Sequence, residues 1–235
     1  MAQRPVYIPS KSTDFLVKTV MVDFDWFPGM SVIQKQKSID SLHAAAKNKL
    51  SDVTSLLEVS SKSKVDLGVN LSAFNLMIND KKRALEFSVE AAFQSSKVFQ
   101  HGGPFTGLLE ATPKAAKRDE RLKESGRLIN FKFYNQDWPL EPKTAFYDYL
   151  YVNALLKHNE FHSEIVEYSA FTDIEFNPKK SINCQAYSVA LFSSLYQRGL
   201  LDENKLKKKE YFLDLVASFE VSNADNQVDI QPQLI

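Results

Sequence analysis

Apolar side chains recur three and four positions apart along three long stretches of the chain, which is the spacing of one buried face of an α-helix. The first stretch covers residues 34–50, and Ser31 is placed to cap its start. A second begins at Pro142, and a third runs from a cap at Ser181 to Gly199. These segments predict the longest helices of the protein.

Shorter runs rich in β-branched and aromatic residues predict strands between these helices. Two of them, residues 71–78 and 85–87, are joined through Asn79 and Asp80 as in a hairpin. The others cover residues 15–24, 56–60, 128–133 and 171–176. With no repeat and no Gly-, Pro- or Ser-rich linker, the pattern predicts an α+β fold, a mainly helical single domain with small β-sheet elements.

The hairpin leads into a short helical pattern, Ser88 to Lys97, with Ser88 as its cap. Glu90, Gln94 and Lys97 fall on one face because offsets of four and seven return to the same side of a helix. An apolar stripe lies next to that face. This arrangement is typical of the edge of a cleft, and also of an ordinary solvated helix.

A second polar pattern follows Thr112 and Pro113, which predict a helix start. The helix to about Glu124 carries Lys114, Lys117, Arg118 and Arg121, with Asp119 and Glu120 interleaved. It is the best candidate for a basic face, although a solvated, salt-bridged helix has the same pattern.

Along the chain the predicted organisation has three parts. Residues 1–55 form an N-terminal extension, a strand plus a helix, packed on the main domain. Residues 56–200 form the main domain, and residues 201–235 a C-terminal segment that ends in a polar tail.

The charge balance limits how the protein can meet a charged partner. The 29 basic and 29 acidic residues cancel, so any contact with nucleic acid must come from a local patch. The one cysteine, Cys184, excludes an internal disulfide framework, and the four scattered histidines lack a zinc-binding pattern. The histidine pattern therefore predicts no metal site. Neither a hydrophobic leader nor a membrane-spanning run is visible, which predicts a soluble cytoplasmic protein.

Several of these residues stand at the spacing of a known family pattern. Leu71-Ser72-Ala73-Phe74 is followed by Ser88-x-Glu90-x-x-Phe93-Gln94-x-x-Lys97, then by Asp137-Trp138, Asp173 and Asn183. In this order they resemble the NADAR family, small domains that act on N-glycosides related to NAD and ADP-ribose. Ala73 stands where the family has Asn, and Asn75 lies two positions further on.

The longer N-terminal part, residues 34–43, and the Ser60-to-Ser63 loop resemble the branch that is paired with a DarT-type toxin. That toxin ADP-ribosylates guanine bases in DNA. The resemblance therefore implies an antitoxin that hydrolyses the bond between ADP-ribose and guanine. Its partners would be ADP-ribose, ADP-ribosylated single-stranded DNA and the toxin, and no cofactor is implied.

Cleavage of such a bond needs a proton for the leaving base and stabilisation of positive charge at the anomeric carbon. Glu90 is the candidate for both tasks. A neutral lysine could attack the anomeric carbon of the opened ribose as a Schiff base, and Lys97 and Lys62 are equal candidates. Asp173 is a candidate second carboxylate that orients the lysine or the ribose hydroxyls.

Aromatic and amide side chains of the pattern are candidates for binding the ligand. Phe74 and Trp138 could stack on a base. Amides suit hydroxyls and base edges, and the hydroxyl of the Leu-Ser-x-Phe segment is part of the implied site. The polar members of this group are Ser72, Asn75, Gln94 and Asn183.

Two other functions fit the same residues. One is an N-glycosidase on small metabolites such as riboflavin-pathway intermediates, which a chain without net charge suits. The other is a module that binds ADP-ribose without hydrolysing a conjugate.

Overall fold

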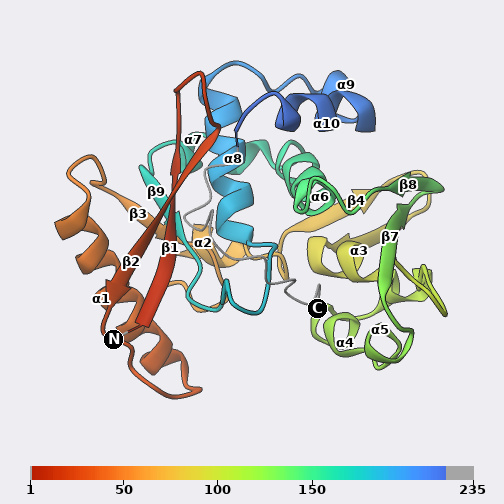
Figure 1. The fold of residues 1–235 in the computed structure, drawn as a ribbon, viewed down its shortest axis with the longest axis horizontal. Helices are drawn as coiled ribbons and strands as arrows, with labels where there is room; N and C mark the ends of the chain where they lie inside the picture. Colours follow the sequence, from red (N-terminus) through yellow and green to blue (C-terminus); the bar gives the residue numbers. More distant parts are fainter. Residues whose placement is uncertain (1, 221–235) are drawn as a thin grey trace.

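In the computed structural model, which describes residues 2–220, small sheets and helices surround one long helix, α8 (Gln185–Gln197) (Figure 1). One sheet has the strand order β2-β1-β9-β3, a second pairs β4 with β5, and a third has the order β6-β7-β8. The strands are β1 (Ala2–Pro9), β2 (Val17–Phe24), β3 (Leu56–Glu58), β4 (Met77–Asp80), β5 (Leu85–Ser88), β6 (Lys97–Phe99), β7 (Leu128–Phe133), β8 (Gln136–Trp138) and β9 (Ala170–Thr172).

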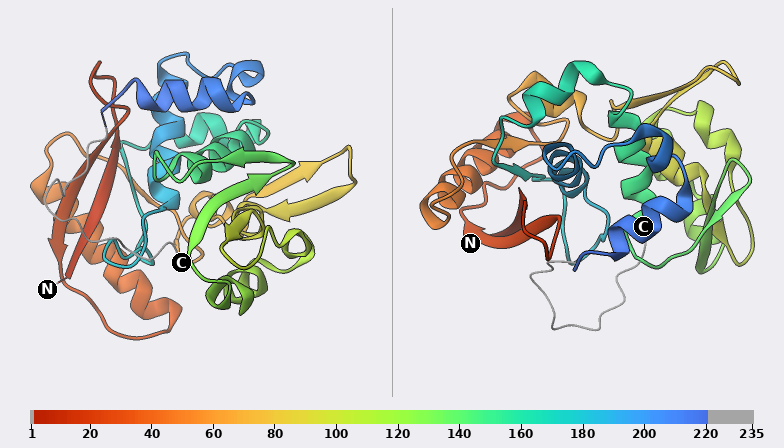
Figure 2. Two further views of the ribbon diagram at one scale, coloured as in Figure 1. Left: turned by 45° about the vertical axis from the view of Figure 1, so that its right-hand side comes forward. Right: turned by 90° about the horizontal axis from the view of Figure 1, so that it is seen from above.

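The helices cover these sheets and pack on α8. Helix α1 (Val32–Lys49) lies on the strands β1 and β2, and α6 (Ala145–Leu155) packs on α8 (Figure 2). The others are α2 (Asp66–Asn70), α3 (Val89–Ser95), α4 (Pro113–Arg118), α5 (Arg121–Glu124), α7 (Asn159–Ile165), α9 (Glu203–Leu206), α10 (Lys209–Ala217) and the 3-10 helix η1 (Thr106–Glu110). The α+β fold predicted from the sequence, a mainly helical single domain with small sheets, is confirmed.

The N-terminal segment is joined to the rest of the chain by backbone pairing. Strand β1 pairs with β2 along its whole length, and Tyr7 in β1 pairs with Phe171 in β9. One group of buried apolar residues lies between this sheet and α1, and a larger one surrounds α3, α6 and α8. Residues 1–55 therefore form the edge of a sheet whose other strands belong to the main domain.

Local signals place several helix starts correctly. Ser31, Ser88 and Thr112 each accept a hydrogen bond from the backbone N–H three residues on, as predicted for caps. Ser181 does not cap α8, because that helix begins only after Cys184 and Ser181 Oγ donates to the Asn183 carbonyl.

Two further predictions are wrong in detail. Residues 71–76 turn instead of forming a strand, since the backbone N–H groups of Asn75 and Leu76 both donate to the Ser72 carbonyl. Helix α3 ends at Ser95, where the hydroxyls of Ser95 and Ser96 bond back to the Ala92 carbonyl. Lys97 therefore begins strand β6 and does not continue the helix.

The C-terminal part contains two helices that the sequence did not predict. Helix α10 buries Phe212 against the main core, while Lys205, Lys207 and Lys208 are exposed, as expected for a solvated cluster. The predicted tail, residues 220–235, lies outside the described residues except for Glu220. Along the described part of the chain, no helix is both long and apolar enough to cross a lipid bilayer.

Candidate functional site

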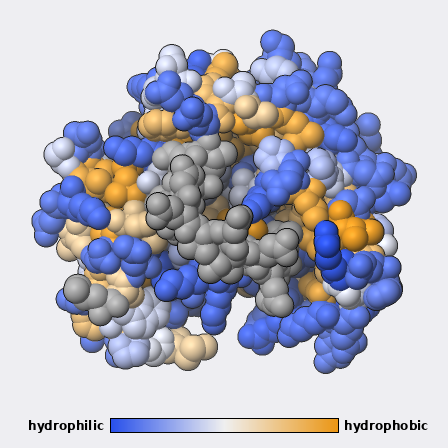
Figure 3. All heavy atoms as spheres, in the orientation of Figure 1, coloured by the Kyte–Doolittle hydropathy of each residue, from blue (hydrophilic) through white to orange (hydrophobic). Residues whose placement is uncertain are grey.

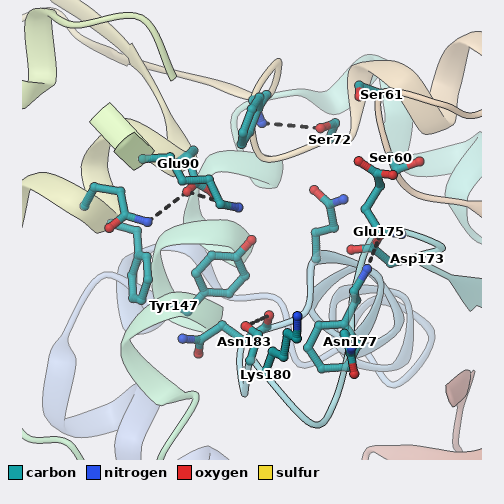
Figure 4. A pocket seen from close by; sticks show the side chains of 17 residues that line it. Ser60, Ser61, Ser72, Glu90, Tyr147, Asp173, Glu175, Asn177, Lys180 and Asn183 are labelled. Atoms are coloured by element: carbon teal, nitrogen blue, oxygen red, sulfur yellow. Dashed lines mark hydrogen bonds and ion pairs between the residues drawn. The ribbon is translucent and has the colours of Figure 1, made fainter. Parts of the chain in front are cut away.

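A pocket of about 280 Å³ lies where α3, α4, α6 and the start of α8 meet the ends of β3 and β9 (Figure 4). Its wall combines carboxylates, amides, hydroxyls and two lysines with four aromatic rings. The lining residues are Ser60, Ser61, Ser72, Phe74, Glu90, Phe93, Gln94, Lys117, Tyr147, Asp173, Glu175, Phe176, Asn177, Lys180, Ser181, Asn183 and Gln185. The predicted residues Glu90, Gln94, Asp173, Ser72, Phe74 and Asn183 thus meet in one place.

Glu90 and Gln94 form one wall, on successive turns of α3. The Gln94 Nε2 donates to Glu90 Oε1 at 2.9 Å, and both side chains are buried. Lys117 reaches the same carboxylate from α4, with its Nζ 3.6 Å from Glu90 Oε1 and 5.3 Å from the centre of the Phe74 ring. The sequence placed Lys117 only on a basic helix, and the tertiary structure turns it into the pocket.

The opposite wall is built from two strand ends. Strands β3 and β9 run parallel, with Glu58 paired to Thr172, so the residues that follow them leave the sheet at the same edge. Ser60 follows β3 and Asp173 follows β9, and both side chains line the pocket. This geometry explains how residues more than 100 positions apart come together.

Glu58 lies behind this wall and ties its parts together. Its Oε1 accepts hydrogen bonds from Ser60 Oγ (2.7 Å) and from the Ile174 N–H (2.8 Å), and its Oε2 accepts from Thr172 Oγ1 (2.8 Å). The His43 Nε2 of α1 lies 2.8 Å from the same Thr172 hydroxyl. Glu58 therefore fixes the backbone that carries Asp173. The lone acidic residue within Leu56-Leu57-Glu58-Val59 was the sequence signal for it.

Two buried carboxyl groups stand close together at this edge. Burial, together with the nearby Asp173 charge, raises the pKa of Glu58 to about 8. Burial also raises the pKa of Asp173, although the N–H groups of Glu175 and Phe176 donate to its Oδ1 and favour the ionised form. Burial lowers the pKa of His43 to about 4, so its ring is neutral. Glu58, whose pKa is raised furthest, is therefore the protonated member of the pair near neutral pH.

This assignment predicts a pH-dependent effect of Glu58→Gln. The amide of Gln has the shape of a protonated carboxyl group, so its oxygen keeps the bonds from Ser60 and Ile174, and its N–H can donate to the Thr172 hydroxyl as a protonated Glu58 would. We expect it to cleave substrate like the wild type at pH 7. Above about pH 8, where wild-type Glu58 ionises beside Asp173, the ratio of variant to wild-type rate should rise.

The control is Glu58→Ala, which removes both carboxyl oxygens and with them the bonds to Ser60, Ile174 and Thr172, and should lower the rate at every pH. Equal losses in Glu58→Gln and Glu58→Ala across the pH range would contradict a protonated Glu58.

Gln185, at the first turn of α8, connects the two walls. Its Oε1 accepts from the Ala73 N–H at 2.8 Å, and its side chain also hydrogen-bonds the Asp173 carboxyl group. Because the Ala73 bond is made by the backbone N–H, it does not depend on the side chain at position 73. The alanine that replaces the family's Asn therefore leaves the turn that presents Ser72 and Phe74 intact. No pattern in the sequence singled out Gln185.

Of the two candidate lysines, neither is among the residues that line the pocket. Lys97 is buried directly behind it, with Nζ 4.9 Å from the centre of the Phe93 ring. Burial lowers the pKa of Lys97 to about 8, against the attraction of Glu90. Within residues 2–220, no hydrogen bond or ion pair engages its Nζ. Lys62 is half-buried in the loop after β3, where its carbonyl accepts from Gln36.

Two predicted ligand-binding residues lie away from the pocket. Trp138 is buried in the core, where its ring packs on Phe146 and Tyr149. Asn75 is exposed, and its Nδ2 donates to the Val69 carbonyl at 2.8 Å. The aromatic rings that do line the pocket are Phe74, Phe93, Phe176 and Tyr147.

Tyr147 comes from α6 and was not singled out in the sequence. Its ring meets Phe93 edge to face, and its hydroxyl points into the pocket (Figure 4). Burial raises the pKa of Tyr147 well above its usual value, and the charge of Glu90 adds to this. The group is therefore a neutral hydrogen-bond donor. Among residues 2–220, no three His, Cys, Asp or Glu side chains converge to hold a metal ion.

Comparison with known proteins identifies the family of the chain. The chain matches the family described as DarT1-associated NADAR antitoxin over residues 2–226, which is nearly its whole length. None of the curated proteins searched matches it. The protein belongs to the NADAR family, in the branch of antitoxins associated with DarT1.

Proposed function

We propose that this antitoxin is a hydrolase that removes ADP-ribose from ADP-ribosylated guanine in DNA and so reverses the modification made by its toxin. The main support for this proposal is the position of the Glu90 side chain in the pocket. Its carboxylate is buried in the pocket wall, with Gln94 on one side and Lys117 on the other. A group held in this way can give a proton to a leaving base and stabilise positive charge on the ribose.

The pocket also holds hydrogen-bond acceptors without a partner. Gln94 Oε1 and Asn183 Oδ1 are both buried, and neither has a hydrogen-bond donor within the described part of the chain. Buried acceptors are normally satisfied, so they suit ligand groups that donate. Ribose hydroxyls and the N–H groups of guanine are such donors. The Tyr147 hydroxyl and the Lys180 ammonium can donate hydrogen bonds, which suits phosphate or carbonyl oxygens of a ligand.

Lys97 is the stronger of the two candidate nucleophiles. With a pKa of about 8, about a tenth of its amine is neutral at pH 7. In the ring-opened sugar the neutral amine adds to the anomeric carbon and passes a proton to the Glu90 carboxylate, and the bond to the guanine nitrogen breaks as that nitrogen takes this proton from Glu90. Water then hydrolyses the imine, which frees ADP-ribose and restores the amine. Asp173 is proposed to hold the ribose hydroxyls.

The direct test uses a single-stranded oligonucleotide that carries one ADP-ribosylated guanine. Incubation with the protein should release ADP-ribose and leave unmodified DNA, both measured by mass spectrometry. An isolated ADP-ribosylated guanosine and a riboflavin-pathway N-glycoside serve as parallel substrates. Turnover of the riboflavin-pathway compound alone, or binding of ADP-ribose without turnover of any of the three, would overturn the proposal.

A further inference from the structure

Basic side chains gather at one border of the pocket although the chain as a whole carries no net charge. Helix α4 contains Lys114, Lys117 and Arg118 and no acidic residue. Lys117 lines the pocket, while Lys114 and Arg118 are exposed and pair with no acidic side chain within residues 2–220. Lys180, from the loop before α8, is exposed and unpaired in the same way. We call these four residues the basic rim.

Hydrophilic side chains cover the lower right of the molecule, over α4 and α5, in Figure 3. Asp119, the acidic residue next to Arg118, does not neutralise the rim because it is already paired, whereas the exposed Glu120 and Glu124 have no ion pair among the described residues. Asp119 binds Arg121, with 2.7 Å between its Oδ1 and the Arg121 Nε. Lys117 pairs with Glu90, so the free cations of the rim within the described part of the chain are Lys114, Arg118 and Lys180. The rim is therefore a local field that favours an anionic chain passing the pocket.

A second surface, which is apolar, lies at the start of α1, outside the pocket lining. Met30 is 93% exposed and Ile33 67%, and with Phe27 and Val32 they form what we call the apolar loop, residues 27–33. Four of the eight large hydrophobic residues exposed among residues 2–220 are in this short segment. Exposed apolar clusters of this kind mark binding surfaces.

The apolar loop is connected to the pocket through Lys35. This residue of α1 places its Nζ 2.9 Å from Glu175 Oε1, a lining group, and 4.9 Å from the centre of the Trp26 ring. The start of α1 and helix α4 lie toward the same end of the molecule (Figures 1 and 2). Cations at the pocket border and apolar side chains at the start of α1 match the two halves of a nucleotide, phosphate and base.

We propose that a single strand of nucleic acid crosses the pocket mouth, with its phosphates on the basic rim and its unstacked bases on the apolar loop. This inference rests on the proposed function, because it assigns the nucleotides on either side of the modified guanine. A single strand fits better than a duplex, since only unstacked bases expose faces to apolar side chains. Cations supply the part of the affinity that depends on salt.

The test measures binding of a labelled, unmodified single-stranded oligonucleotide by fluorescence anisotropy at several salt concentrations. The variant Lys114→Ala/Arg118→Ala should weaken binding about tenfold at low salt and make the slope of log K against log salt shallower by about 1.4. Its matched control is Lys81→Ala/Lys82→Ala, which removes the same charge at the β4–β5 turn, away from the pocket lining.

A second variant, Phe27→Ser/Met30→Ser/Ile33→Ser, removes the apolar part without a change in charge. It should weaken binding about fivefold or more while the salt slope stays the same. On modified oligonucleotide both variants should raise KM and leave kcat unchanged, and cleavage of ADP-ribosylated guanosine should not change at all.

Three results would overturn the inference. These are oligonucleotide affinity unchanged in both variants, affinity equally reduced in the Lys81/Lys82 control, and reduced binding of the purified toxin with unchanged oligonucleotide binding. Because unmodified strands are never cleaved, failure of the hydrolase proposal leaves this binding test intact. Normal hydrolysis with unaltered strand binding would reject the surface and keep the hydrolase.

Discussion

Glu90→Gln should lower the release of ADP-ribose from modified DNA by about 10²- to 10⁴-fold, the range found for a positioned acid or base. The amide cannot give a proton to the leaving guanine and has no charge to stabilise the ribose cation. It remains close in shape to the carboxylate, so the bond from Gln94 and the packing of α3 are kept. Single-turnover kinetics on the modified oligonucleotide measure the effect.

The matched control is Glu86→Gln, an exposed carboxylate on β5 that does not line the pocket. It should cleave at the wild-type rate. Thermal unfolding of both variants separates lost chemistry from lost structure. A Glu90→Gln protein that is folded and fully active would remove Glu90 from the mechanism.

Lys97→Met should both stabilise the protein and stop its chemistry. A buried ammonium whose pKa falls from 10.5 to about 8 costs about 3 kcal/mol when it is protonated in the folded state. Methionine fills the same space without that cost, so the free energy of unfolding should rise by up to this amount at pH 7. A functional residue that opposes stability is a common finding in active sites.

The pH dependence of this gain follows from the direction of the shift. Below about pH 8 Lys97 is protonated in both states and the full penalty applies. Between about 8 and 10.5 the unfolded chain binds more protons, so wild-type stability rises with pH and the advantage of methionine shrinks. Urea unfolding at pH 7 and at pH 10 measures the difference.

Trapping with cyanoborohydride during turnover identifies the amine. Wild type and Lys62→Met should gain the mass of reduced ADP-ribose, whereas Lys97→Met should not. An adduct that persists in Lys97→Met and disappears in Lys62→Met would assign the nucleophile to the loop after β3. If wild type forms no adduct, only acid–base catalysis by Glu90 remains.

The sequence by itself determined the features that depend on neighbouring residues. Ser88 caps α3, and the spacing of four residues puts Gln94 beside Glu90, because a helix returns to the same face after one turn. The strand at Leu128–Phe133 was predicted with its observed bounds. Motif spacing led to the NADAR family, which the match over residues 2–226 confirms.

Only the tertiary structure decided which distant groups share the pocket. Parallel pairing of β3 with β9 brings Glu58 and Ser60 to Asp173, and no local pattern contains a contact over 114 residues. Lys97 does not lie on the predicted helix face, because two serine hydroxyls hydrogen-bond to a carbonyl at the end of α3, where the helix stops. Trp138 packs in the aromatic core instead of the pocket. Burial then set the pKa values of Glu58 and Lys97, since only a folded chain can remove the water that favours the charged form of each group.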